Sequence, residues 1–271
     1  MIRTSPKPLP RPIVPYPKVE RLRERRPCHM TLIAAFRTYD GDVLLCSDRQ
    51  EDNGISKQSV DKIHRIRGLK QCDVFIAGAG PSTPIKSAFL SVDEAFRKAE
   101  TKGKNLVEES SKIIEFGLRK THRRYKKYLE TWGAVNFIIV VAPRSKDFLP
   151  ILYHTEGHLA VPEARYVAHG SGKAVADYLA GRLYADDLMK KWLVILAAFI
   201  FRESGESSSG VGFGSDMLLI SREGRRTEFW HETVADIEKA LPALANCLHD
   251  SWMAADAAGK FPEWTNRKDY T

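Results

Sequence analysis

The order in which strand-like and helix-like segments follow one another constrains the fold of this chain more than any other feature. The apolar runs at 31–38 and 43–48 flank the sequence YDGD, in which Asp-Gly supplies the positive φ that a tight hairpin turn requires. Two further strand-like runs follow at 59–66 and 72–80. Four strands so close together in the sequence predict antiparallel pairing.

The rest of the chain alternates between pairs of helices and groups of strands. Apolar residues at three- and four-residue spacing predict helices, and short β-branched or aromatic runs between turn residues predict strands. In chain order these are helices at 85–100 and 105–130, strands at 136–143, 150–155, 158–162 and 165–172, helices at 173–184 and about 187–203, strands at 215–221 and 226–232, and a helical tail from 233 to about 257.

This order is not the strict strand–helix alternation of a doubly wound fold. It predicts an α+β protein, a four-layer αββα sandwich in which two stacked antiparallel sheets carry a pair of helices on each outer face. The length of 271 residues and the hydrophobic content of 43% are sufficient for one such domain, which we place at 31–271 with the helical tail included.

Residues 1–30 have a different composition. Residues 1–29 contain eight Lys or Arg against two Glu, and so carry six of the eight net positive charges of the chain. They also contain seven of its fourteen prolines, which disfavour both helices and sheet ladders. We predict a disordered, basic, proline-rich extension. A basic run in the second helix, 119–127, is interpreted as a solvated helix face, so nucleic-acid binding is not expected.

Several features limit the cellular setting. Residues 1–30 lack the apolar core of a secretory signal, and the four cysteines form no CxxC pair, which together favour a reduced, cytoplasmic location. The longest apolar run, 192–201, is too short to cross a bilayer and suits a buried helix, so no membrane association is expected.

Three motifs suggest chemistry that their context does not support. HGSGK at 169–173 lacks the first glycine and the final Ser or Thr of a phosphate-binding loop, and GVGFG at 210–214 is not a dinucleotide fingerprint. His154 and His158 flank a turn without further metal-ligating residues nearby. No GxSxG nucleophile elbow occurs. The sequence therefore predicts neither a cofactor nor a metal.

Four segments in order resemble the proteasome β-subunits and the bacterial proteasome-related peptidase that works with an AAA+ unfoldase, all of them N-terminal-nucleophile hydrolases. The segments are TLIAAFRTYDGDVLLCSD, SKQSVDKIHRI, FIAGAGPSTPIKSAF and YVAHGSGKAVADYLA, which together span about residues 31–220. The pattern that includes SDRQEDNGISKQSV is most similar to a group of proteasome-like proteins other than the proteasome itself. The resemblance implies a threonine-type peptidase.

The resemblance implies five site residues. Thr31 would be the nucleophile, and its own α-amino group would accept the hydroxyl proton, which requires Thr31 to be the first residue. Lys62 would favour the neutral form of that amine, and Asp48 would hold the charge of Lys62. Ser171 would hydrogen-bond near the amine, and the backbone N–H of Gly78 would stabilise the oxyanion.

A free N-terminus at Thr31 could arise in two ways. Residues 1–30 could be a propeptide cut between Met30 and Thr31, or translation could start at Met30 and the methionine be removed; the second explains why MT opens the first strand. The aspartate and serine that the family carries after the fourth helix have no clear counterpart in RESGESSSGVGFG, where Glu203 and Ser208 are candidates and neither is assigned.

Two functions of different classes follow. The first is a threonine peptidase or amidohydrolase acting on peptides or unfolded protein as a homo-oligomer, with or without an ATP-dependent unfoldase. The second is a catalytically inactive scaffold of the same fold, or a binding subunit whose basic extension docks an acidic partner or nucleic acid. A mature chain that begins at Thr31 favours the enzyme.

Overall fold

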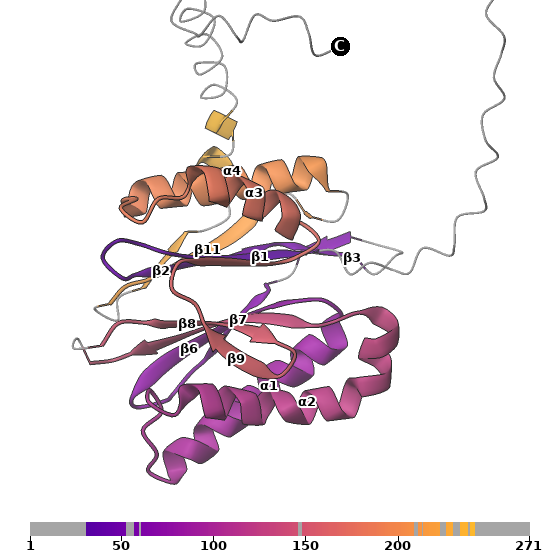
Figure 1. The fold of residues 1–271 in the computed structure, drawn as a ribbon, viewed down its shortest axis with the longest axis vertical. Helices are drawn as coiled ribbons and strands as arrows, with labels where there is room; N and C mark the ends of the chain where they lie inside the picture. The colour runs from indigo at the N-terminus through magenta and orange to yellow at the C-terminus, as the bar shows by residue number, and fades with distance from the viewer. Residues whose placement is uncertain are drawn as a thin grey trace, which may run out of the picture.

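The computed structural model describes residues 31–52, 57–59, 61–145, 148–208, 211–212, 214–222, 226–229, 234–237 and 239–241. Within these residues the chain forms four layers, with α3 and α4 on one sheet and α1 and α2 on the other (Figure 1). The expected α+β, four-layer αββα sandwich is confirmed. The extension at 1–30 and most of the helical tail lie outside the described residues, apart from short helical stretches at 234–237 and 239–241.

The first sheet has the order β10-β1-β2-β11-β12, with every pair antiparallel. Its strands are β1 (Leu32–Arg37), β2 (Val43–Asp48), β10 (Tyr166–Gly170), β11 (Ser215–Ile220) and β12 (Arg226–Phe229). The hairpin β1–β2 turns at Gly41, whose φ of 84° is in the region that favours glycine. This sheet therefore joins the start of the domain to segments more than 130 residues further along the chain.

The second sheet has the order β5-β6-β7-β8-β9 and is also antiparallel. Its strands are β5 (Ile63–Ile66), β6 (Cys72–Ala79), β7 (Asn136–Pro143), β8 (Ile151–Glu156) and β9 (Leu159–Pro162). The first four predicted strands are thus divided between two sheets rather than joined in one. A separate pair, β3 (Gln50–Asp52) with β4 (Lys57–Ser59), lies between them in the sequence.

Three apolar clusters fill the spaces between the four layers. Because side chains alternate along a strand, Leu32, Ala34 and Phe36 pack under α3 and α4, whereas Ile33 and Ala35 face the second sheet. The helices are α1 (Ser82–Thr101), α2 (Ser110–Trp132), α3 (Lys173–Leu183) and α4 (Lys190–Ser207). Each fully buried large apolar side chain contributes about 1.5–3 kcal/mol to stability.

Two predicted boundaries differ from the structure for local reasons. The second helix was expected from residue 105 but begins at Ser110. Asn105 Oδ1 accepts hydrogen bonds from the N–H groups of Val107 and Glu108, so this side chain stabilises a turn instead. The strand expected over 59–66 is regular only from Ile63 onward, which leaves Lys62 just ahead of β5.

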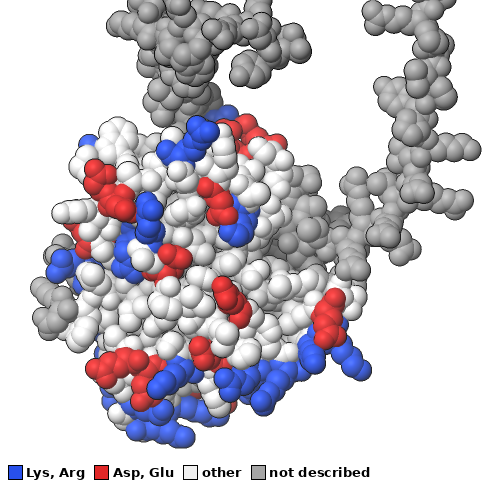
Figure 2. Space-filling view, viewed as in Figure 1, with Lys and Arg blue, Asp and Glu red and all other residues white. Residues whose placement is uncertain are grey.

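The surface over α1 and α2 carries most of the Lys and Arg side chains visible in Figure 2. The six basic residues between 119 and 127 are exposed on α2, and Lys120 forms an ion pair with Glu94 of α1 at 3.0 Å. These contacts agree with a solvated helix face. No described helix is long and apolar enough to cross a membrane.

Candidate active site

Thr31 lies immediately before β1, where the hairpin register brings it beside the end of β2. Only 4% of the surface of Thr31 is exposed. The hydroxyl Oγ1 donates a hydrogen bond to Oδ1 of Asp48 at 2.6 Å, and the N–H of Leu32 donates to the same oxygen at 2.9 Å. The first turn of the domain therefore holds the hydroxyl of Thr31 against a carboxylate.

Asp48 is the last residue of β2 and is completely buried. Its second oxygen, Oδ2, accepts a hydrogen bond from the N–H of Gly212 at 3.2 Å. Burying a carboxylate is costly unless its oxygens are hydrogen-bonded, and here both oxygens have donors. Asp48 is thus fixed from β1 on one side and from the segment before β11 on the other.

Lys62 reaches the same carboxylate from the second sheet. Its Nζ lies 2.7 Å from Oδ1 of Asp48 and also donates a hydrogen bond to Oγ1 of Thr31. Only 11% of the Lys62 side chain is exposed. An ammonium in this position stabilises negative charge that develops on the Thr31 hydroxyl oxygen during attack.

Ser171 follows β10 and faces the backbone of Thr31. Its Oγ accepts a hydrogen bond from the N–H of Thr31 at 3.2 Å and lies 3.2 Å from the carbonyl oxygen of Thr31. Its own N–H donates to that carbonyl at 2.9 Å. The serine hydroxyl therefore lies beside the nitrogen that would become the α-amino group of a mature chain beginning at Thr31.

Gly170 is a site residue that the sequence analysis did not assign. Its φ is 108°, and a Cβ atom built there would lie 2.0 Å from the carbonyl oxygen of Thr31. Any other residue would displace Thr31 or the end of β10. The Gly-Ser-Gly sequence after a strand was a signal for this position, since close backbone approach is a common reason for glycine.

Gly78 lies near the end of β6 and is connected to the site through strand register. The pairing of Ile63 with Ala77 puts the preceding residue, Lys62, at the level of Gly78. A Cβ atom at Gly78 would meet the side chains of Ile85 at 2.8 Å and Phe137 at 3.2 Å, so packing alone requires glycine. The oxyanion role of its N–H stays a prediction.

The segment after α4 contributes a backbone donor. Glu203 and Ser208 are the sequence candidates for the family's acidic residue in this region. The contact to Asp48 comes instead from the N–H of Gly212. A glycine N–H carries no sequence signature that would have identified it. Within the described ranges, no three His, Cys, Asp or Glu side chains are grouped to bind a metal ion.

A neutral histidine lies next to the site. Burial, assisted by the neighbouring His154, lowers the pKa of His169 to about 4. The two imidazole rings, from β10 and β8, lie 5.8 Å apart between the sheets. His154, expected to be structural, therefore lies beside His169 rather than pairing with His158, whose ring lies near His122.

No protein-family model matches the chain, and no curated protein matches it. Solved structures do match. Anbu (ancestral beta-subunit) from Yersinia bercovieri aligns with a TM-score of 0.67 and 15% identity, over 81% of this chain and 97% of that protein. Anbu from Hyphomicrobium sp. strain MC1 aligns with a TM-score of 0.63 and 14% identity, over 82% and 97%. The chain has the Anbu fold.

This finding corrects the assignment made from sequence. The resemblance was attributed to proteasome β-subunits and the bacterial proteasome-related peptidase, but the similar structures are Anbu proteins, which are proteasome-like and form a distinct family. The sequence analysis relied on four short motifs, whereas the comparison of structures covers 81–82% of the chain. At 14–15% identity the likeness establishes the fold alone.

Proposed function

We propose that this protein is a threonine peptidase, or another amide hydrolase, of the N-terminal-nucleophile class. The observation that supports it best is the convergence on Thr31: Asp48 and Lys62 contact its hydroxyl, and Ser171 contacts its nitrogen. A threonine that served only as a strand residue would not need a buried ion pair at its hydroxyl. Asp48 and Lys62 come from the first part of the domain, and Ser171 from a segment 140 residues after Thr31.

The proposed reaction begins with the hydroxyl of Thr31 attacking the carbonyl carbon of an amide. The α-amino group of Thr31 takes the hydroxyl proton and later delivers it to the leaving amine, giving an ester of Thr31 that water then hydrolyses. A free α-amino group has a pKa of about 7.7–8.0, and the nearby ammonium of Lys62 favours its neutral form. The N–H of Gly78 would donate to the oxyanion.

The mechanism requires that residues 1–30 be absent from the active form. In the full sequence the nitrogen of Thr31 belongs to a peptide bond with Met30 and cannot accept a proton. Cleavage between Met30 and Thr31, or translation from Met30 followed by loss of the methionine, would each release the amine. The domain proper is then 31–271.

The burial of Thr31 bears on substrate and assembly. In the full chain Thr31 is 4% exposed, and a buried nucleophile is accessible to an extended peptide or an unfolded segment more readily than to a folded surface. We propose such substrates and a homo-oligomer; an ATP-dependent unfoldase would supply unfolded protein. The buried, unpaired thiols of Cys46 and Cys72 support a reducing, cytoplasmic setting.

The test combines the chain terminus with active-site labelling. The native protein is isolated from its source and its N-terminal mass is measured, and the recombinant chain beginning at Thr31 is treated with an electrophilic inhibitor directed at N-terminal threonine. We expect a start at Thr31, labelling of the wild type and of Thr31→Ser, and no labelling of Thr31→Ala. Thr31→Ala is also expected to unfold at the wild-type temperature, within a few degrees.

The opposite result favours the second function. If residues 1–30 persist in the native protein and the inhibitor does not label the chain beginning at Thr31, the protein is an inactive scaffold or binding subunit of the same fold.

A further inference from the structure

A cleft with a volume of about 890 Å³ lies between β5, β11 and α1. Asp61 and Ile63 line it, whereas Lys62 between them contacts Thr31. The segment 61–65 therefore contributes residues both to the cleft and to the active site. Its volume is within the range of small-molecule sites, about 300–1,000 Å³.

The lining of the cleft carries an excess of positive charge. Five Lys or Arg side chains line it against three Asp. Arg49 contacts Asp216 at 3.1 Å and Arg97 contacts Asp93 at 2.7 Å. Within the part of the chain that the structure describes, the two exposed cations Lys86 and Arg67 form no ion pair with any carboxylate. An anion entering the cleft could therefore pair with Lys86 and Arg67 without breaking an existing ion pair.

Two buried nitrogen atoms of the lining residues also lack hydrogen-bond partners among the described residues. They are Nε2 of His64 and Nε of Arg65. A second nitrogen of Arg65 lies 3.3 Å from Asp73, and the ring of His64 stacks on Phe89 at 5.1 Å, so both side chains are held in place. Both nitrogens are closed to solvent, so they form part of the wall of the cleft, and the ion pairs to a ligand would come from Lys86 and Arg67.

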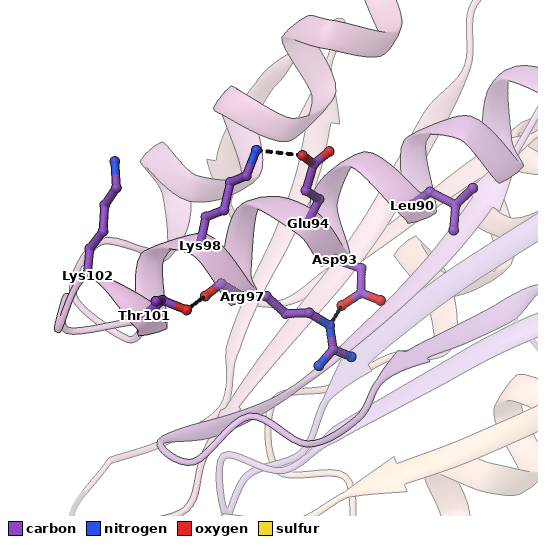
Figure 3. Close-up of a pocket in the computed structure, with 7 residues that line it drawn as sticks. All are labelled: Leu90, Asp93, Glu94, Arg97, Lys98, Thr101 and Lys102. Atoms are coloured by element: carbon purple, nitrogen blue, oxygen red, sulfur yellow. Dashed lines mark hydrogen bonds and ion pairs between the residues drawn. The ribbon is translucent and has the colours of Figure 1, made fainter.

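The polar groups of a second, shallow pocket on α1 are largely paired with one another, in contrast to those of the cleft. Lys98 contacts Glu94 at 2.6 Å, and the Thr101 hydroxyl donates to the carbonyl of Arg97 at 2.9 Å (Figure 3). Figure 3 also shows Arg97 and Asp93 joined to each other on the side of the helix turned towards the strands. The polar groups there are largely paired within the helix, so that pocket offers little to a ligand.

We propose that the cleft between β5, β11 and α1 is a binding site for a small ligand carrying two or more oxyanion groups, either phosphates or carboxylates. Lys86 and Arg67 would form ion pairs with it, and the guanidinium of Arg65 would add positive charge to the wall of the cleft. This assignment does not depend on hydrolysis by Thr31. The hydrogen bonds of the Thr31 hydroxyl and N–H go to Asp48, Lys62 and Ser171, none of which lines the cleft.

The test is calorimetric titration of the full chain with inorganic pyrophosphate and, separately, with citrate at constant ionic strength. We expect one saturable site for at least one of them. Lys86→Gln and Arg67→Gln should each weaken binding by about tenfold, because each removes a charge-assisted contact. The matched control Lys102→Gln removes the same charge from an exposed position of the α1 end outside the cleft and should leave affinity unchanged.

The two probes distinguish the ligand chemistry: tighter pyrophosphate binding indicates a phosphorylated ligand, and tighter citrate binding a polycarboxylate. A second readout is the titration of the His64 imidazole followed by NMR. Burial lowers the pKa of His64 in the free protein, and the bound anion should raise it. The absence of saturable binding by both anions, an equal loss of affinity in Lys102→Gln, or an unchanged His64 titration at saturation would each overturn the assignment.

Discussion

Nζ of Lys62 lies 2.7 Å from Oδ1 of Asp48, and this ion pair joins the two sheets directly beneath the hydroxyl of Thr31. Asp48 is completely buried, and 11% of the Lys62 side chain is exposed. A pair desolvated to this degree is sensitive to the loss of one partner, because the remaining charge stays buried without its counter-ion. The same pair is therefore expected to affect both stability and chemistry.

Lys62→Met should abolish hydrolysis and lower the free energy of unfolding by about 3 kcal/mol, since it leaves the Asp48 carboxylate buried without a cation. The measurements are turnover of a fluorogenic peptide by the chain beginning at Thr31, and urea unfolding. Lys190→Met is the matched control. It breaks a different ion pair, at 2.6 Å to the buried Asp42, and should lower stability without reducing turnover per folded molecule. Normal turnover in Lys62→Met would remove Lys62 from the mechanism.

Ser171→Ala should reduce kcat by about tenfold to a hundredfold while changing stability by about 1 kcal/mol, because the backbone contact from residue 171 to the Thr31 carbonyl is retained. The lost group is the hydroxyl 3.2 Å from the nitrogen of Thr31. Single-turnover kinetics and the pH dependence of kcat would show a defect in proton transfer. An unchanged kcat in Ser171→Ala would exclude the hydroxyl from proton transfer.

Gly170→Ala should inactivate the protein and destabilise it by about 3 kcal/mol or more, because φ is 108° and the new Cβ would lie 2.0 Å from the carbonyl oxygen of Thr31. Gly181→Ala is the matched control. Gly181 lies on the exposed side of α3 with no atom near its Cβ position, so the change should stabilise the helix by up to about 1 kcal/mol. Thermal unfolding of both variants checks the pair; equal melting temperatures would contradict it.

Periodicity and turn residues in the sequence were sufficient to predict the layers of this fold. The Asp-Gly turn after β1, the apolar spacing of α1 and the buried run within α4 each depend on local composition, and each is found where it was expected. The division of the first four strands between two sheets could not be predicted in this way. Which strands pair depends on contacts between distant segments, such as β1 with β10, which leave no trace in local composition.

The candidate site likewise contains residues that the sequence predicted and one that it could not predict. Thr31, Asp48, Lys62 and Ser171 were chosen from short motifs, and the structure brings them together. Gly212 was not found because its contribution is a backbone N–H, which every residue except proline has. The family assignment was wrong: it was based on short motifs, and the similar structures reported above are Anbu proteins.

Stability should fall as the pH drops from about 6.5 to about 4, owing in part to His169. Burial, with a smaller effect of His154, lowers the pKa of His169 to about 4 in the folded protein, against an unfolded value of about 6.5. The unfolded chain therefore takes up the proton first. The neutral ring contributes its full share of the free energy of unfolding above pH 6.5. This contribution is lost on acidification, and at pH 5 the loss is about 2 kcal/mol.

Urea unfolding of the wild type and of His169→Gln at pH 7 and pH 5 measures the contribution of His169 to the loss of stability. The variant should show a smaller decrease between the two pH values, because it has no imidazole to protonate at this position. Burial also lowers the pKa of His64 and His122, so some acid sensitivity should persist in the variant. An identical decrease in both proteins would mean that His169 is protonated as readily in the folded chain as in the unfolded one, and that the space between β8 and β10 is open to water.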